Sequence, residues 1–162
     1  MTHDILYEMI RLNGSDMRRI NHALKVHGFA ICIAGREHYS ETDCLVTSLS
    51  AALHDIAIRH CEAVYGNCGG KLQEKEGPAI ARPLLEKVTD DEALISRVCD
   101  IIAHHHTYKG FNDVCHQALI EADFLVNFDE GAFEKPAFEA AVKKLFKTTA
   151  GKELAQKMFG VR

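Results

Sequence analysis

Apolar residues recur at a spacing of about 3.6 along nearly the whole chain, and no segment keeps the strict alternation of a strand. This pattern predicts helices throughout. An opening helix is expected to end at Asn13-Gly14, and a long helix to run from a cap at Ser15-Asp16 to about His38. In the long helix, one buried stripe is predicted, widened by Val26, Phe29 and Ile33; its members are Met17, Ile20, Leu24, Ile31 and Ala34.

The middle of the chain is predicted to contain two further helices with an irregular segment between them. One helix is expected from Ser40 to about Cys61, followed by a glycine-rich loop from Gly66 to Gly77. Residues 78–87 have a helical pattern in which Pro83 either begins the regular helix or kinks it. The loop does not match a phosphate-binding P-loop, because Leu72 stands where serine or threonine is required.

The last third of the chain also reads as helices. Acidic residues at 90–92 predict a helix start, and this helix runs into the triplet His104-His105-His106. Asn112 or Asp113 caps the next helix, and residues 136–147 and 150–159 read as two amphipathic helices. The fold class expected is an all-α compact bundle of about six to eight helices, in one domain spanning residues 1–162, with the helices of residues 134–159 packed on the remainder.

Composition narrows the class of protein. Apolar residues make up 47% and charged residues 26% of the 162 residues, as in an ordinary soluble domain. The net charge of -4, without a concentrated basic patch, argues against nucleic acid as a partner, and a homodimer is compatible with the sequence. No apolar run approaches the ~18 residues needed to span a membrane. The N-terminus also lacks the pattern of a secretory signal.

The six cysteines include no C-x-x-C pair and mostly fall within helical apolar patterns. We expect them to be reduced and structural, which favours a cytoplasmic protein.

One dipeptide does not fit the packing pattern. His54 and Asp55 stand side by side in an apolar run, where a charge and an imidazole are costly to bury unless a partner compensates them. The residues on their side of the helix are small, which leaves room for something other than protein; they are Thr47, Ser48, Ser50 and Ala51. A metal ion is the partner that best suits an adjacent histidine and aspartate.

Other predicted helices each offer a further candidate ligand: His22, the histidine triplet, and Asp123, an acid on an apolar face. His27 competes with His22, but five helical residues correspond to about 140° of rotation, so one site does not use both. Within the triplet, the periodicity of the apolar residues turns His105 inward.

The ordered set of a histidine, a histidine-aspartate pair, a histidine pair and an aspartate on successive helices resembles the HD-domain superfamily of metal-dependent phosphohydrolases. The matching stretches are 19–26 (RINHALKV), 52–56 (ALHDI), 101–106 (IIAHHH) and 121–126 (EADFLV), so the resemblance covers a motif core of about residues 19–127. It implies that one divalent metal ion is held by His22, His54, Asp55 and Asp123. Such ligands suit Fe, Mn, Mg, Ni or Zn without choosing among them.

The resemblance also suggests a second ion. Glu76 stands where related proteins often place a histidine ligand, His104 or His105 would add another, and Asp55 would bridge the two ions. The family pattern aligns its histidine pair with His104-His105, whereas periodicity favours His105, so the triplet is left open.

The reaction that the resemblance implies is hydrolysis of a phosphate monoester or diester on a small phosphorylated molecule, with a nucleotide as one candidate. Asp55, Lys71 and Lys109 are the catalytic candidates, the lysines because they lie on loops flanking ligands and could neutralise phosphoryl charge. Nucleotidase-type relatives carry an acid about one turn after the pair; here Ile58 and Arg59 stand there. Two alternatives remain: a di-iron oxygenase of the same superfamily, and a non-catalytic nucleotide or metal sensor.

Overall fold

The protein is a bundle of helices, and the computed structural model describes residues 1–161, in which no strand occurs. The predicted all-α fold is confirmed. In chain order the helices are α1 (Thr2–Asn13), α2 (Met17–Arg36), α3 (Glu41–Leu53), α4 (Ile58–Tyr65), α5 (Gly70–Leu85), α6 (Glu92–Ile102), α7 (Val114–Asp129), α8 (Lys135–Leu145) and α9 (Thr149–Phe159). None of the helices in this range is long and apolar enough to cross a membrane.

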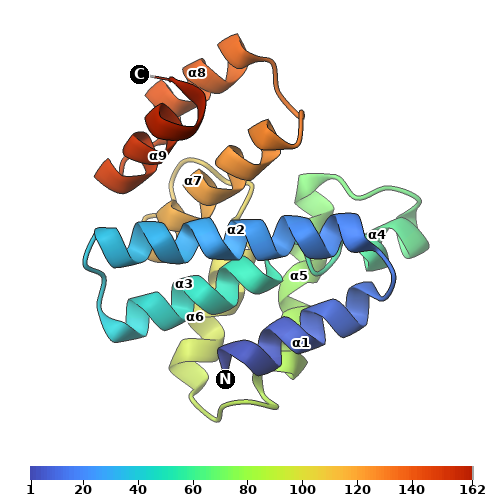
Figure 1. Cartoon of the computed structure of the whole chain (residues 1–162). Helices are drawn as coiled ribbons and strands as arrows, with labels where there is room; N and C mark the ends of the chain where they lie inside the picture. Colours follow the sequence, from blue (N-terminus) through green and yellow to red (C-terminus); the bar gives the residue numbers. More distant parts are fainter. Residues whose placement is uncertain (162) are drawn as a thin grey trace.

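Helix α2 crosses the middle of the bundle (Figure 1) and packs against both α3 and α7. It therefore buries a face that includes Ile20, Val26 and Ala30. The predicted stripe is partly wrong, because Met17 and Leu24 are 58% and 39% exposed. The two helices that pack on α2 decide which positions are buried, and the sequence of α2 alone does not show where they lie.

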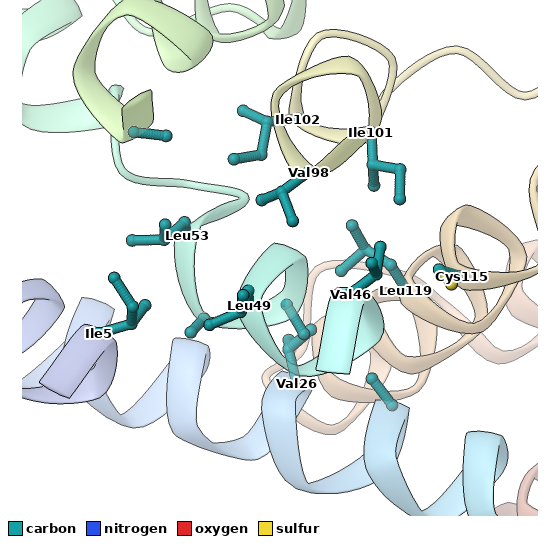
Figure 2. Close-up of a cluster of buried hydrophobic side chains, with 14 of the residues drawn as sticks. Ile5, Val26, Val46, Leu49, Leu53, Val98, Ile101, Ile102, Cys115 and Leu119 are labelled. Carbon is teal, nitrogen blue, oxygen red and sulfur yellow. The ribbon is translucent and has the colours of Figure 1, made fainter. Parts of the chain in front are cut away.

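The main core lies between α1, α2, α3, α6 and α7. Figure 2 shows its side chains pointing toward one another from these helices; those labelled are Ile5, Val26, Val46, Leu49, Leu53, Val98, Ile101, Ile102, Cys115 and Leu119. All ten are essentially inaccessible to solvent. Full burial of a Leu, Ile or Val side chain contributes roughly 1.5–3 kcal/mol. This core fixes the ends of α3 and α6 relative to α2 and α7.

The helix predicted from Ser40 to Cys61 is two helices. Helix α3 ends at Leu53, residues 54–57 form tight turns, and α4 begins at Ile58. In the turns the Ile56 amide donates to the Leu53 carbonyl (3.0 Å), and the Ile58 amide donates to the Asp55 carbonyl (3.1 Å). These are three-residue spacings in place of the four of an α-helix. His54 and Asp55 thus lie at a helix end, where the chain changes direction.

The predicted loop from Gly66 to Gly77 is mostly helix. Only residues 66–69 are irregular, and α5 begins at Gly70 and continues through Pro83, which neither begins the helix nor ends it. A methyl group at Gly77 would stand 2.6 Å from Cγ2 of Ile102. The glycine that suggested a loop therefore allows α5 to pack closely against α6.

The predicted helix starts agree with the caps observed. Asp16 accepts a hydrogen bond from the Arg19 amide at the start of α2, and Asp91 accepts one from the Leu94 amide at the start of α6. Asp113 caps α7 in the same way. Helix α6 ends at Ile102, so the histidine triplet lies in a turn just beyond the helix and not within it.

Helices α8 and α9 pack on α7 around a second apolar cluster, which contains Phe138 and Leu125. The buried carboxylate of Glu121, on α7, accepts hydrogen bonds from the Lys147 and Thr148 amides and from the Thr148 hydroxyl. Burial nevertheless raises the pKa of Glu121. This carboxylate holds the connection between α8 and α9 against α7.

Candidate metal centre

Two groups of side chains with metal-ligating atoms lie next to each other in the bundle. The first ligand group is His22, His54 and Asp123, and the second is Asp55, His105 and His106. Within each group the ligating atoms all lie within 4.8 Å of one another. Helices α2 and α7 supply His22 and Asp123, and the other four residues come from the turns that follow α3 and α6.

The two turns orient their histidines in the same way. The last carbonyls of a helix have no amide partner within it. Here the Nδ1–H of His54 donates to the Ala51 carbonyl (2.9 Å), and that of His105 donates to the Ile102 carbonyl (2.7 Å). A donating Nδ1 leaves Nε2 with a free lone pair, the tautomer that binds a metal.

The Nε2 atoms of His54, His105 and His106 are buried and have no hydrogen-bond partner among residues 1–161. Leaving a buried polar atom unpaired costs about 1–3 kcal/mol. Three such atoms on residues of the two ligand groups are accounted for if cations lie within these groups. The residues therefore fit the metal that the sequence resemblance implies.

His22 is oriented by a carboxylate. Its Nδ1 is hydrogen-bonded to Oε2 of Glu130 at 2.9 Å, while its Nε2 faces Oδ1 of Asp123 at 3.2 Å. Metal-binding histidines almost always donate their second ring N–H to a carboxylate, a carbonyl or a water. The structure thus favours His22 over His27, which is hydrogen-bonded to Ser48 instead.

The spacing between the first ligand group and Asp55 suits one ion. Ligand bonds of about 2.0–2.2 Å place neighbouring ligand atoms about 3.0–3.6 Å apart. Oδ2 of Asp55 lies 3.6 Å from Nε2 of His22 and 3.4 Å from Nε2 of His54. Nε2 of His54 lies 3.7 Å from Oδ1 of Asp123. The four residues that the resemblance nominates for one ion are therefore brought together.

Asp55 faces both groups with different oxygens. Its Oδ2 lies toward His22 and His54, while its Oδ1 lies 3.6 Å from Nε2 of His105. A carboxylate in this position can bridge two ions, which in two-metal sites stand about 3.5–4 Å apart. Asp55 thus lies between the first ligand group and His105.

Charges across the two groups displace several pKa values. Burial lowers the pKa of His54, but the carboxylates of Asp55 and Asp123 outweigh it and raise the pKa to about 9. For His22, burial is likewise outweighed by the bond to Asp123, and its pKa is raised. Burial opposes ionisation of Asp55, but His54 and His105 hold its pKa well below the usual range. The carboxylates of Asp55 and Asp123 thus favour positive charge within the two ligand groups.

Within the triplet, the second group uses His105 and His106. His104 turns away: its Nδ1 donates to the Asp100 carbonyl (2.7 Å), and its ring stacks on Phe111 at 4.4 Å. The turn is fixed by Glu74, which accepts a hydrogen bond from the His106 amide at 3.0 Å. The expectation that His104 points into the site is not met, whereas the inward orientation of His105 is.

Glu76 lies outside both groups. Its Oε1 accepts a hydrogen bond from Tyr65 (2.9 Å) and pairs with Lys75 (3.0 Å). The resemblance suggests it as a ligand of the second ion because it stands where related proteins often place a histidine. On a regular helix α5, its carboxylate points toward α4 instead.

A cavity of about 340 Å³ opens beside the first ligand group, and both His22 and Asp55 line it. Arg18 and Arg19 also line it, together with Glu62, whose Oε1 accepts a 2.6 Å hydrogen bond from Arg19. The proposed catalytic residues Lys71 and Lys109 are exposed and are not among its lining residues. Arg18 and Arg19 are therefore the better-placed cations.

Sequence reasoning missed three residues of this region. His106 was not singled out within the triplet, and Glu62 and Glu130 received no role. Glu130 carried a usable signal, because it follows Asp123 by seven residues, about two helical turns on the same face. His106 and Glu62 each depend on a tight turn that the apolar pattern predicts as continuous helix, so the pattern does not reveal them.

No family model, curated protein or solved structure matches this chain. The functional argument therefore rests on the residues of the site.

Proposed function

We propose that this protein is a metal-dependent phosphohydrolase of the HD-domain type that uses two divalent ions and acts on a small phosphorylated molecule. The observation that carries the proposal is the set of buried, unpartnered Nε2 atoms of His54, His105 and His106. Those of His54 and His105 face the two oxygens of Asp55, and His106 belongs to the same ligand group as Asp55 and His105. His22 and Asp123 complete the first position. A cytoplasmic location belongs to the same proposal, supported by the six free cysteines.

Divalent ions held in such a site supply Lewis acidity to a phosphoryl oxygen and lower the pKa of water. The residues of the chain have three further tasks in the proposal. Asp55 would offer one oxygen to each ion, Arg18 and Arg19 neutralise charge on the phosphoryl oxygens in the cavity, and Glu62 accepts a proton.

The nucleotidase pattern has an acidic residue about one turn after the His-Asp pair, and here Glu62 takes that role from a later position. Ile58 lines the cavity as an apolar residue, and Arg59 donates to the Leu12 carbonyl at 3.0 Å. Glu62, one turn further along α4, presents a carboxylate to the same cavity as Asp55. It supports hydrolysis with a proton acceptor at a different position along the helix.

The test combines elemental analysis of the purified protein with phosphatase and phosphodiesterase assays under Mn, Mg, Ni and Fe. We expect His54→Ala and Asp123→Ala each to lose both metal and phosphate release. His3→Ala is the control, because His3 is 85% exposed on α1. A full metal complement in either site variant would refute the centre. His116 is not a suitable control, because its Nε2 is hydrogen-bonded to the His104 carbonyl.

The di-iron oxygenase shares the same ligand chemistry, since four imidazoles and two carboxylates also suit iron. Anaerobic loading with iron followed by Mössbauer spectroscopy separates the two reactions. A coupled di-iron signal together with oxygen consumption and no phosphate release would favour the oxygenase. Metal-loaded protein that binds a nucleotide without turnover would favour the sensor.

A further inference from the structure

One more buried polar atom near the site is unexplained. The side chain of Gln73, on α5, is buried, with 6% of the residue exposed. Its Nε2 donates to the Cys68 carbonyl at 2.7 Å, while its Oε1 has no hydrogen-bond partner among residues 1–161. Of the six side-chain atoms in this condition, three are the Nε2 atoms of His54, His105 and His106 in the two ligand groups. The amide oxygen is a further free acceptor in the same part of the molecule.

Gln73 lies on the face of α5 that packs against the turn carrying His106. Residues at spacings of three and four share one face of a helix, so Gly70, Gln73, Glu74 and Gly77 lie together on α5. Glu74, its neighbour on this face, accepts the hydrogen bond from the His106 amide, and a methyl group at Gly70 would stand 2.8 Å from the His106 ring. Gly77, one turn later, abuts Ile102.

A second contact links Gln73 to a residue that lines the cavity beside Asp55. The carbonyl that receives its Nε2 belongs to Cys68, and Cys68 lines the cavity that Asp55 and His22 also line. The hydrogen bond holds the amide nitrogen against the 66–69 segment, so the amide oxygen is the end left free. The side chain is thus tethered between the cavity and the His106 turn.

We propose that Oε1 of Gln73 is a ligand of the second ion, together with Asp55, His105 and His106. This inference rests on the metal centre of the proposed function. It implies that the two positions differ in affinity. The first has the carboxylate of Asp123 as well as a share of Asp55, whereas the second has only its share of Asp55 and a neutral amide. The second ion therefore binds more weakly.

The experiment is a titration of the metal-free full-length protein with Co²⁺, followed by calorimetry and by visible absorption. We expect two binding events of unequal affinity. Gln73→Leu should weaken the second event by at least about tenfold and leave the first unchanged, since even losing a group that supports a ligand costs that much. Gln73→Glu, which adds a charge at the same position, should tighten the second event. Glu76→Gln, a change on the same helix outside both ligand groups, should alter neither.

If Gln73→Leu lowers the melting temperature while both binding events and their spectra persist, Gln73 is only structural and the inference fails. It also fails if Gln73→Glu leaves the second event unchanged. Two Co²⁺ events that depend on Gln73, without phosphate release from any substrate, would support this inference and contradict the phosphohydrolase proposal alone.

Discussion

The imidazoles of His54 and His105 are each fixed by a bond to the carbonyl three residues before them. The sequence showed that these residues are anomalous, since a histidine in an apolar run calls for a partner. It did not show which histidine of the triplet points inward. That choice depends on the tight turn after Ile102 and on Glu74, which is distant in sequence and binds the His106 amide. Local periodicity therefore selected His105 correctly and overlooked His106.

The bond from Glu130 to His22 should tune metal affinity. Glu130→Gln removes the charge that orients the His22 ring, and loss of such a partner typically weakens metal binding by about 10–100-fold. The dissociation constant of the first metal event, measured by calorimetry, tests this. Asp129→Asn is the matched control, because Asp129 binds Lys25 as Glu130 does but makes no bond to His22. Equal affinities in the two variants would contradict the role of Glu130.

Among the helices, most starts were predictable and two boundaries were not. Caps such as Asp16 and Asp91 act through their own neighbours, so the sequence reveals them. The break after Leu53 and the start at Gly70 depend on packing between helices. Glycine at 70 and 77 disfavours a helix locally, yet it permits close contact with the His106 turn and Ile102.

Gly70→Ala should disturb the second ligand group. Alanine is the better helix former, so local propensity predicts a gain in stability, but the added methyl group would stand 2.8 Å from the His106 ring. We expect the free energy of unfolding to fall by about 1–3 kcal/mol and the second metal event to weaken. Gly69→Ala is the control, since its methyl group would meet only Asn67, at 3.9 Å. Thermal unfolding and Co²⁺ titration of both variants test this prediction. A Gly70→Ala variant that is more stable and binds metal normally would contradict the close contact between Gly70 and the His106 ring.

Across the whole molecule, the candidate centre joins α2 and α7 to the ends of α3 and α6. A bound ion should remove the part of the pH dependence of the unfolding free energy that comes from His54. The pKa of His54 is about 9 in the metal-free fold, against about 6.5 unfolded. A raised pKa stabilises the fold fully below the unfolded value, and this contribution is lost as pH rises toward the folded value.

The metal-free protein should therefore lose stability between pH 6.5 and about 8.5, on the order of 1–3 kcal/mol. With metal bound, His54 is already deprotonated in the folded state, and this loss should disappear. Urea denaturation across the range, with and without metal, measures the two slopes. Identical slopes would mean that no ion displaces the proton of His54.

The all-α class required only the periodicity of apolar residues, and the anomaly of His54-Asp55 only residue type. The set His22, His54, Asp55 and Asp123 came from the resemblance to the HD-domain superfamily, which rests on short stretches of sequence. The cavity, the second ligand group and the position of Gln73 depend on how helices distant in sequence meet. Those contacts are decided by shape, for which the pattern of apolar residues is a weak guide.

Glu121 sets a limit on how the chain can be shortened. It stands two residues before Asp123 on α7, and its carboxylate is satisfied by the segment that joins α8 to α9. Removing residues 134–161 would take away the Lys147 and Thr148 donors and leave the carboxylate only the side-chain amide of Gln117, two residues from the candidate ligand Asp123. The last two helices are thus part of the smallest unit that can keep α7 in place, and a fragment ending after α7 is a poor choice for isolating the site.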